Sequence, residues 1–276
     1  MWAQAKILLL GLLQTIHDTI TGIGIGSNFA WGLAIIAITL IVRAVTYPLT
    51  RKQMVSMQKM QKMQPMLKVL QDKYGKDKDG LNREMMALYK EHGVNPMSGC
   101  WPMLVQLPIL ILLYGVLYDL TKTEAFTNVT FLGVNLGGSV LTTVADALKL
   151  VDESGVRIPD EQLGFVMVFL SSFTNLGLLF SNLGTWIFNF LLLAIIAFLT
   201  WYQQHISSQG NPQMAMMSWF MPLFLTFICF GLPGGVLLYW GLSSLMGILH
   251  QLKVAKKTSE EMKVKPILYK EKPKTK

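Results

Sequence analysis

Residues 29–48, FAWGLAIIAITLIVRAVTYP, form a long apolar run with one charged side chain, Arg43. About 20 mostly apolar residues are enough for a helix to cross a bilayer. An arginine at bilayer depth costs at least about 2.5 kcal/mol, so it usually faces water, a partner or a cavity. No later apolar run contains an Asp or Glu that could neutralise it. Arg43 therefore predicts a water-accessible polar pocket; the alternative is that its long side chain reaches the headgroups near Pro48.

The composition is that of an integral membrane protein. Hydrophobic residues make up 52% and charged residues 14% of the 276 residues. Basic residues outnumber acidic ones by ten to five in 51–95 and by nine to three in 253–276, but 119–163 has three against seven. Because basic loops remain in the cytoplasm, we expect 51–95 and the tail inside and 119–163 outside.

Six apolar runs are long enough, or nearly so, to cross a membrane: 29–48, 100–118, 164–182, 185–204, 215–231 and 234–252. Six crossings would put the basic tail outside, so one run has to be excluded. The run 164–182 contains several Ser, Thr and Asn residues. We interpret it as an interfacial or re-entrant segment on the outer face. Five crossings then place the N-terminus outside and the C-terminus inside.

These observations predict an all-α membrane protein. It has a five-helix transmembrane core, a cytoplasmic helical hairpin and an outer interfacial N-terminal helix that is not a cleaved signal peptide. The expected segments are an outer interfacial helix in 1–28, a first span in 29–50, the hairpin in 51–99, a second span in 100–118, an extracytoplasmic loop with the interfacial segment in 119–184, spans three to five in 185–252, and a disordered basic tail in 253–276.

Five methionines recur at every third position in the first arm of the expected hairpin: Met54, Met57, Met60, Met63 and Met66. We expect helix in 51–74, a break in 75–80 and helix again in 81–92. Methionine is flexible and polarizable, which suits contacts with varied apolar substrates. The alternative interpretation is packing against lipid or against the second arm.

The sequence lacks the motifs of common enzymes and metal proteins. It has no GxxxxGK[ST] phosphate loop, and its four histidines are scattered, with no Ser/His/Asp or His/Glu constellation. Cys100 and Cys229 lie at or in apolar runs and are interpreted as structural thiols. We therefore expect no enzymatic activity, no cofactor and no metal.

Four ordered motifs resemble the YidC family of membrane protein insertases, in its short form without a large periplasmic domain. They are TLIVRAVTYPLTRKQ at 39–53, the hairpin pieces QP at 64–65 and EMMALYK at 84–90, NPMSGCWPMLVQLP at 95–108, and PGGVLLYWGLS at 233–243. Their order and spacing make the resemblance specific. The loop 119–184 is longer than the resemblance implies, and no role is assigned to it.

The resemblance implies a hydrophilic groove, open to the cytoplasm and to lipid, with Arg43 as its positive centre. Thr39 and Gln106 would line the groove, and Trp240 would contact the passing substrate helix. Each residue has a simpler alternative: Thr39 bonding its own helix backbone, Gln106 forming an interhelical hydrogen bond, and Trp240 anchoring at the interface.

The function implied is that of a membrane insertase in the bacterial plasma membrane. It would move the polar tail of a nascent membrane protein through the groove and release its helix into lipid. The implied partners are nascent membrane proteins, the ribosome through the basic tail, the Sec translocon and anionic lipids. The alternatives are a folding and assembly chaperone without translocation activity, and a small-solute transporter, which the single charged span disfavours.

Overall fold

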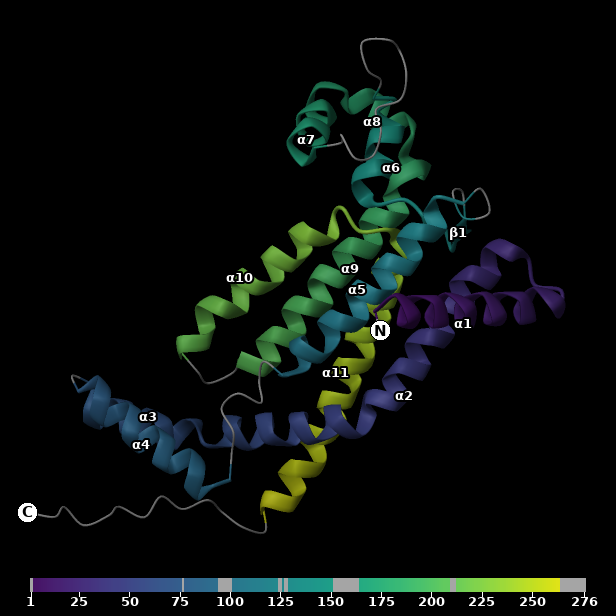
Figure 1. The fold of residues 1–276 in the computed structure, drawn as a ribbon. Helices are drawn as coiled ribbons and strands as arrows, with labels where there is room; N and C mark the ends of the chain where they lie inside the picture. The colour runs from purple at the N-terminus through teal and green to yellow at the C-terminus, as the bar shows by residue number, and fades with distance from the viewer. Residues whose placement is uncertain are drawn as a thin grey trace, which may run out of the picture.

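The computed structural model describes residues 2–75, 77–93, 101–123, 126, 129–150, 164–208 and 212–263; for 101–105, 207–208, 212–218 and 257–263 it describes the backbone alone. This part of the chain is helical apart from one short β-hairpin (Figure 1). The elements are α1 (Trp2–Gly22), α2 (Ser27–Lys62), α3 (Gln64–Tyr74), α4 (Lys78–Glu91), α5 (Trp101–Thr121), β1 (Thr130–Phe131), β2 (Val134–Asn135), α6 (Val140–Ala147), α7 (Phe165–Thr174), α8 (Leu176–Ser181), α9 (Leu183–Ser208), α10 (Pro212–Cys229) and α11 (Gly234–Lys263).

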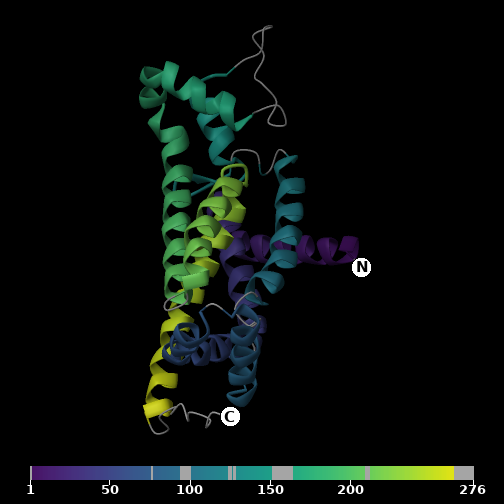
Figure 2. The same ribbon diagram turned by 90° about the vertical axis from the view of Figure 1, so that its left-hand side faces the viewer.

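The long apolar helices α2, α5, α9, α10 and α11 form a bundle. Helix α11 packs against α2 and α9, and α10 packs against α9. Figure 2 shows α3 and α4 at one end of the bundle and α6, α7 and α8 at the other. We call these the hairpin end and the loop end. Helix α1 runs across the long helices and packs against α2 and α5 (Figures 1 and 2).

The bundle has the composition of a membrane domain. Among the described residues, three helical stretches are long and apolar enough to cross a bilayer: Ser27–Lys62, Leu183–Ile206 and Gly234–Lys256. Helices α5 and α10 add the shorter apolar stretches Gln106–Thr121 and Trp219–Cys229. Many large apolar side chains on α9 and α10 are exposed, as expected for surfaces that face lipid. The chain is therefore an all-α membrane protein, as the sequence predicted.

Helix α2 does not end where the first span was expected to end. It continues past residue 50 to Lys62, with Pro48 inside it, and changes direction along its length (Figure 1). Proline removes one backbone hydrogen bond and crowds the preceding turn, which explains a bend. The helix is therefore continuous across the predicted boundary between span and hairpin at 50/51. The break comes at Met63, just before Pro65 in the first turn of α3.

The helical hairpin itself is confirmed. Helices α3 and α4 pack against each other, and Asp77 caps α4 by accepting a hydrogen bond of 2.9 Å from the Gly80 N–H. Its core includes Tyr89, and burial raises the pKa of this phenol. The predicted break in 75–80 is also confirmed, although α4 begins inside it at Lys78. The last residues of the predicted hairpin, 94–99, lie outside the described part of the chain.

The run 164–182 forms no continuous helix that could span a membrane. It contains α7, with ten residues, and α8, with six, separated by a break at Asn175. At about 1.5 Å per residue, ten residues reach about half of a hydrocarbon core of about 30 Å. Its exclusion from the spans is confirmed. Both helices expose large apolar side chains, including Phe169, Phe173 and Phe180, at the loop end.

The loop 119–184 contains a β-hairpin that the sequence reasoning missed. Strands β1 and β2 pair antiparallel around Leu132 and Gly133, which have positive φ of 51° and 85°. Two central residues with positive φ are typical of the tightest hairpin turns, and glycine favours this conformation. Phe131 of β1 packs where Gly32 of α2 leaves room, because a Cβ on Gly32 would lie 2.1 Å from the ring.

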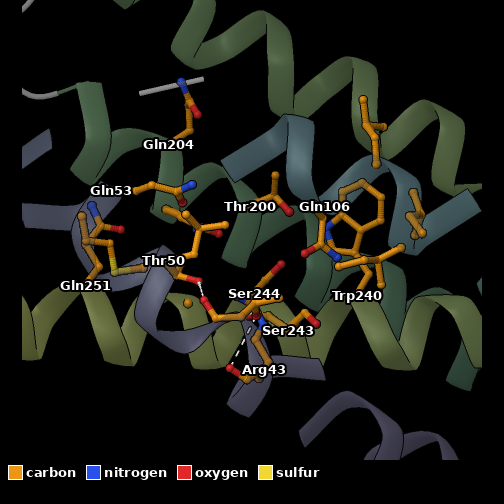
Figure 3. A pocket seen from close by; sticks show the side chains of 18 of the residues that line it. Arg43, Thr50, Gln53, Gln106, Thr200, Gln204, Trp240, Ser243, Ser244 and Gln251 are labelled. Atoms are coloured by element: carbon orange, nitrogen blue, oxygen red, sulfur yellow. Dashed lines mark hydrogen bonds between the residues drawn. The ribbon is translucent and has the colours of Figure 1, made fainter. Parts of the chain in front are cut away.

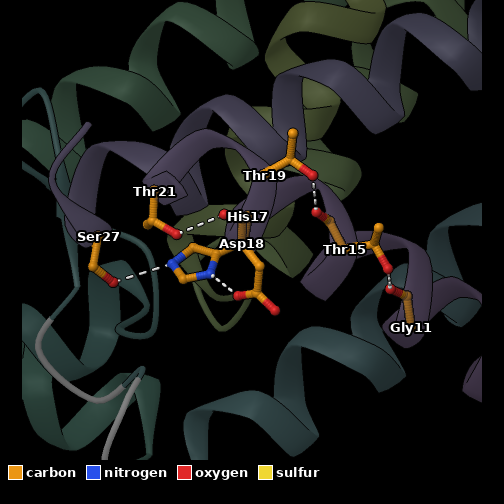
Figure 4. Close-up of polar contacts among 7 residues, drawn as sticks. All are labelled: Gly11, Thr15, His17, Asp18, Thr19, Thr21 and Ser27. Carbon is orange, nitrogen blue, oxygen red and sulfur yellow. Dashed lines mark hydrogen bonds and ion pairs between the residues drawn. The ribbon is translucent and has the colours of Figure 1, made fainter. Parts of the chain in front are cut away.

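The turn from α1 to α2 is held by polar contacts that Figure 4 shows. His17 Nε2 and Ser27 Oγ lie 3.1 Å apart, and His17 Nδ1 and Asp18 Oδ1 lie 2.9 Å apart. The imidazole also stacks on Trp31 with ring centroids 4.0 Å apart. These contacts fix α1 against the start of α2. The predicted N-terminal helix is confirmed, with α1 ending at Gly22.

The predicted tail is partly helical. Helix α11 continues from the bundle to Lys263, so the expectation of a disordered arm from residue 253 is wrong for its first eleven residues. They follow the last span without a helix-breaking Gly or Pro, so the helix can continue. Residues 264–276 lie outside the described part.

Candidate functional site: a polar cavity inside the bundle

Side chains from α2, α5, α9, α10 and α11 line a cavity inside the bundle (Figure 3). Arg43 is the only charged residue among the described residues that line it. The uncharged polar ones include Thr46, Thr50, Gln53, Gln106, Thr200, Gln203, Gln204, Ser243, Ser244 and Gln251. Apolar side chains, among them Met54, Met57 and Trp240, fill the rest of the wall. The cavity is therefore polar, amide-rich and basic.

The cavity has a volume of about 250 Å³. About 10–15 Å³ of such space is enough for one water, so the cavity has room for several waters. The cavity can therefore hydrate a polar segment.

Arg43 points into the cavity. Its Nη2 donates a hydrogen bond of 2.5 Å to the carbonyl of Ser243 on α11. Among the described residues, the ion pairs are Lys6–Asp119 and His17–Asp18, and neither involves Arg43. A guanidinium has five N–H donors, so most of them remain available to water or to an anionic group. The sequence allowed two arrangements, a polar pocket or the lipid headgroups, and the side chain adopts the first.

Gln106 joins α5 to α11. Its Nε2 donates a hydrogen bond of 2.8 Å to the hydroxyl of Tyr239, which is 1% exposed. Gln106 also lines the cavity, so the interhelical bond and the lining role coexist. Tyr239 is a neighbour of the cavity that sequence reasoning missed as a functional residue, although it lies within the quoted 233–243 motif.

Trp240 lines the cavity as predicted. The half-buried indole also packs against the apolar cluster that contains Ile196 and Leu237. An interfacial anchor would instead expose its ring at the end of the bundle. Trp240 therefore presents a broad apolar surface beside the polar part of the wall.

The prediction that Thr39 lines the groove is wrong. Thr39 is fully buried, and its Oγ1 donates a hydrogen bond of 2.7 Å to the Ile35 carbonyl one turn earlier. It shares a helix face with Arg43, but it lies one turn nearer the loop end, among the buried residues Ile35 and Ile38. The long Arg43 side chain reaches the cavity, and the short threonine is enclosed by apolar packing.

The five methionines do not act as one stripe. Met54, Met57 and Met60 line the cavity, and Met60, Met63 and Met66 belong to the core of the hairpin with Leu70. A repeat of three residues falls short of a 3.6-residue turn by about 60° per step, so the stripe rotates around the helix. The first three remain candidate substrate contacts, and the last three have the packing role that was the alternative.

Sequence reasoning missed several polar residues of the wall. Thr46, Thr50 and Gln53 follow Arg43 at three, seven and ten positions, which places all four on one face of a helix. That spacing was a usable signal. Gln53 is 8% exposed, and its Nε2 has no hydrogen-bond partner among the described residues. Buried polar groups are normally paired, so this orphan donor is an unusual feature of the cavity wall.

The sequence led us to expect no Ser/His/Asp constellation, and the structure corrects this. Ser27, His17 and Asp18 form one chain of contacts at the α1–α2 turn (Figure 4). None of them lines the cavity, and the Asp18 side chain is 77% exposed. The group has a clear packing role against Trp31. In the described segments, no three His, Cys, Asp or Glu side chains are placed to hold a metal ion.

Comparisons with known proteins agree with the motifs. The family model described as "60Kd inner membrane protein" matches residues 24–261. The chain is similar to proteins named "Membrane protein insertase YidC" from Treponema denticola, at 34% identity over 82% of this chain and 34% of the relative, and from Tolumonas auensis, at 32% identity over 88% and 34%. It spans about a third of the length of these curated relatives.

A solved structure agrees as well. It is described as "Active YidC insertase crystal structure with the first transmembrane domain resolved", and it is 26% identical to this chain with a TM-score of 0.55. The match covers 95% of this chain and 46% of that one. The motifs, the helical bundle and the match over 24–261 agree. The chain therefore belongs to the 60Kd inner membrane protein family, the YidC family that its motifs predicted.

Proposed function

We propose that this protein is a membrane insertase. It moves the polar tail of a nascent membrane protein through the cavity, and the apolar helix of that substrate then enters lipid. The observation that carries the proposal is the spare hydrogen-bonding capacity of Arg43 in a cavity with no acidic wall residue among those described. The relatives named as insertases support it.

The proposed mechanism shortens the distance over which the polar tail of the substrate has no hydrogen-bond partners. A polar group without partners in hydrocarbon costs several kcal/mol, so a hydrated tail crosses about 30 Å of lipid very slowly. A wet cavity between the helices supplies partners over part of this distance. Arg43 attracts acidic groups of the tail. Burial of the substrate's apolar helix in lipid drives the step, so we propose that no covalent reaction and no cofactor are required.

Reconstitution tests this function. The purified protein is placed in liposomes, and a single-span substrate with a short acidic tail is synthesised outside them. Insertion predicts that the tail becomes protected from added protease at a rate well above that in empty liposomes. Protection at the empty-liposome rate, together with improved folding of a substrate that is already inserted, would favour the assembly chaperone instead.

The proposed orientation places the N-terminus outside and the hairpin end in the cytoplasm. Ten basic residues in 51–95 support this assignment. The connection between α9 and α10 lies at the hairpin end, because Gln61 Nε2 donates a hydrogen bond of 2.7 Å to the Ile206 carbonyl. A cysteine placed in 205–213 should therefore resist an impermeant thiol reagent in intact cells and react in inverted vesicles. Reaction in intact cells would contradict five crossings.

The basic tail is proposed to dock the translating ribosome as well as anionic lipid. Deleting 258–276 leaves Lys253, Lys256 and Lys257 near the membrane, so the truncated protein should insert normally. Its co-sedimentation with ribosomes should fall and become less sensitive to salt, because fewer counterions are released on binding. Unchanged ribosome binding across a salt series would leave only the lipid role. The Sec translocon is a further proposed partner.

A further inference from the structure

A buried asparagine on α9 is bonded to the loop that follows α5. Asn189 is 1% exposed, and its Oδ1 accepts a hydrogen bond of 2.8 Å from the N–H of Asn135. Its Nδ2 donates two bonds of 3.0 Å, to the carbonyls of Asn135 and Gly138. One acceptor and both donors of the amide are thus used. A carboxylate of the same shape could not make the two donations.

The same segment is also bonded to the start of α11. The N–H groups of Gly234 and Gly235 donate bonds of 2.9 Å to the carbonyls of Gly138 and Leu136. The backbones approach so closely that a Cβ on Gly234 would lie 2.1 Å from the Asn135 oxygen. Residues 135–138 are therefore clamped between α9 and α11, and Asn189 supplies the side-chain part of the clamp.

The clamped loop completes an apolar layer at the loop end of the cavity. Leu136 is fully buried and Phe131 is 5% exposed, and both belong to one cluster with Ile35, Leu117 and Val236. Tyr239, which accepts the hydrogen bond from the cavity residue Gln106, is in the same cluster. The layer therefore begins where the polar wall ends. Three of its buried members, Val129, Phe131 and Leu136, come from the loop, so the layer is complete only while the loop is held in place.

We propose that residues 129–138 are the permeability seal of the cavity and that Asn189 is the positioning residue that locks it. A water-filled cavity leaves only the remaining apolar layer as a barrier between the two sides of the membrane. The proposal rests on the cavity being wet, as in the proposed function. It assigns the long loop a role: to keep the cavity closed on the loop side while the hairpin side remains open to substrate.

Side-specific thiol labelling tests the seal. The reporter is Ser244→Cys, in the cavity wall, in a protein whose Cys100 and Cys229 are changed to alanine. A small, charged methanethiosulfonate reagent is applied to intact cells for the loop side and to inverted vesicles for the hairpin side. We expect the unmodified seal to allow labelling from the hairpin side only. The substitution Asn189→Asp places an oxygen against two carbonyls and should raise loop-side labelling about tenfold or more, which corresponds to about 1.4 kcal/mol of the closing free energy.

The matched control is Asn182→Asp. Asn182 also lies near the loop end and donates bonds of 2.9 and 3.1 Å to the carbonyls of Ala147 and Leu178, but it has no contact with 129–138 among its recorded bonds. It should leave loop-side labelling unchanged. For Asn189→Asp, the ratio of loop-side to hairpin-side labelling should also fall at lower pH, because the protonated carboxyl regains one donor. General loosening of the fold would not produce this pH dependence.

A second variant tests the seal if the Asn189→Asp protein does not accumulate in the membrane. Phe131→Ala removes part of the apolar layer and leaves the hydrogen bonds to Asn189 intact, and it should also raise loop-side labelling. Unchanged loop-side labelling in the folded variants would overturn the proposal. The measurement uses no substrate, so its failure would leave the insertase proposal untouched, and a failed insertion assay would not affect the seal.

Discussion

Replacing Arg43 with alanine should reduce insertion of an acidic-tailed, single-span substrate at least about tenfold, and Arg43→Lys should retain much of the activity. A hydrogen bond to a charged group contributes about 1.5–3 kcal/mol, and a loss of about 1.4 kcal/mol already changes a rate or equilibrium tenfold. Lysine keeps the charge but loses the planar fork of donors. The protease-protection assay in proteoliposomes measures the difference.

The matched control is Arg51→Ala. Arg51 is an exposed residue on the same helix, two turns away, and does not line the cavity. The Arg51→Ala protein should insert the substrate at nearly the normal rate. A substrate with a neutral tail should depend less on Arg43 than the acidic one does. Equal activity of the arginine, lysine and alanine proteins on the acidic-tailed substrate would contradict the proposed electrostatic role of Arg43.

Replacing Gly234 with alanine should strongly destabilise the folded protein. The new Cβ would lie 2.1 Å from the Asn135 carbonyl oxygen and 3.1 Å from Asn189 Nδ2, so backbone has to move. Overpacking of this kind costs about 1–3 kcal/mol and sometimes more. Thermal unfolding of the purified protein in detergent measures the effect. The control Gly231→Ala has its nearest neighbour, the Ile228 carbonyl, at 4.0 Å and should behave almost normally. Equal unfolding midpoints would show that the close approach does not stabilise the fold.

The sequence was sufficient for the elements that depend on composition and local pattern. Apolar runs located the long helices, and the charge distribution excluded 164–182, which the breaks at Asn175 and Asn182 confirm. The motif resemblance predicted that Arg43, Gln106 and Trp240 line one groove. All three line the cavity, although they lie far apart in the chain. These predictions succeed because hydrophobicity and helical period act over short distances along the chain.

The predictions failed where a residue's role depends on its position along the bundle axis or on contacts with residues far away in the sequence. Thr39 has the correct helix face but lies in the apolar layer beyond the cavity, and periodicity carries no information about where a cavity ends. The contact between Asn189 and Asn135 joins residues 54 positions apart. The space beside Gly234 is filled by the backbone of Asn135, which belongs to a loop distant in the sequence. No local pattern distinguishes these arrangements.

The most direct test asks whether the substrate tail passes through the cavity. A photo-crosslinking amino acid is placed at Thr46, which lines the cavity, or at its neighbour Val45, whose side chain is 73% exposed on the outside of the bundle. Ribosome-bound chains of increasing length present the acidic tail of a single-span substrate. The proposed path predicts strong crosslinks from position 46 to the tail at intermediate lengths, weak ones from position 45, and loss of both after release. Equal crosslinking from the two positions, or none from position 46 at any length, would contradict it.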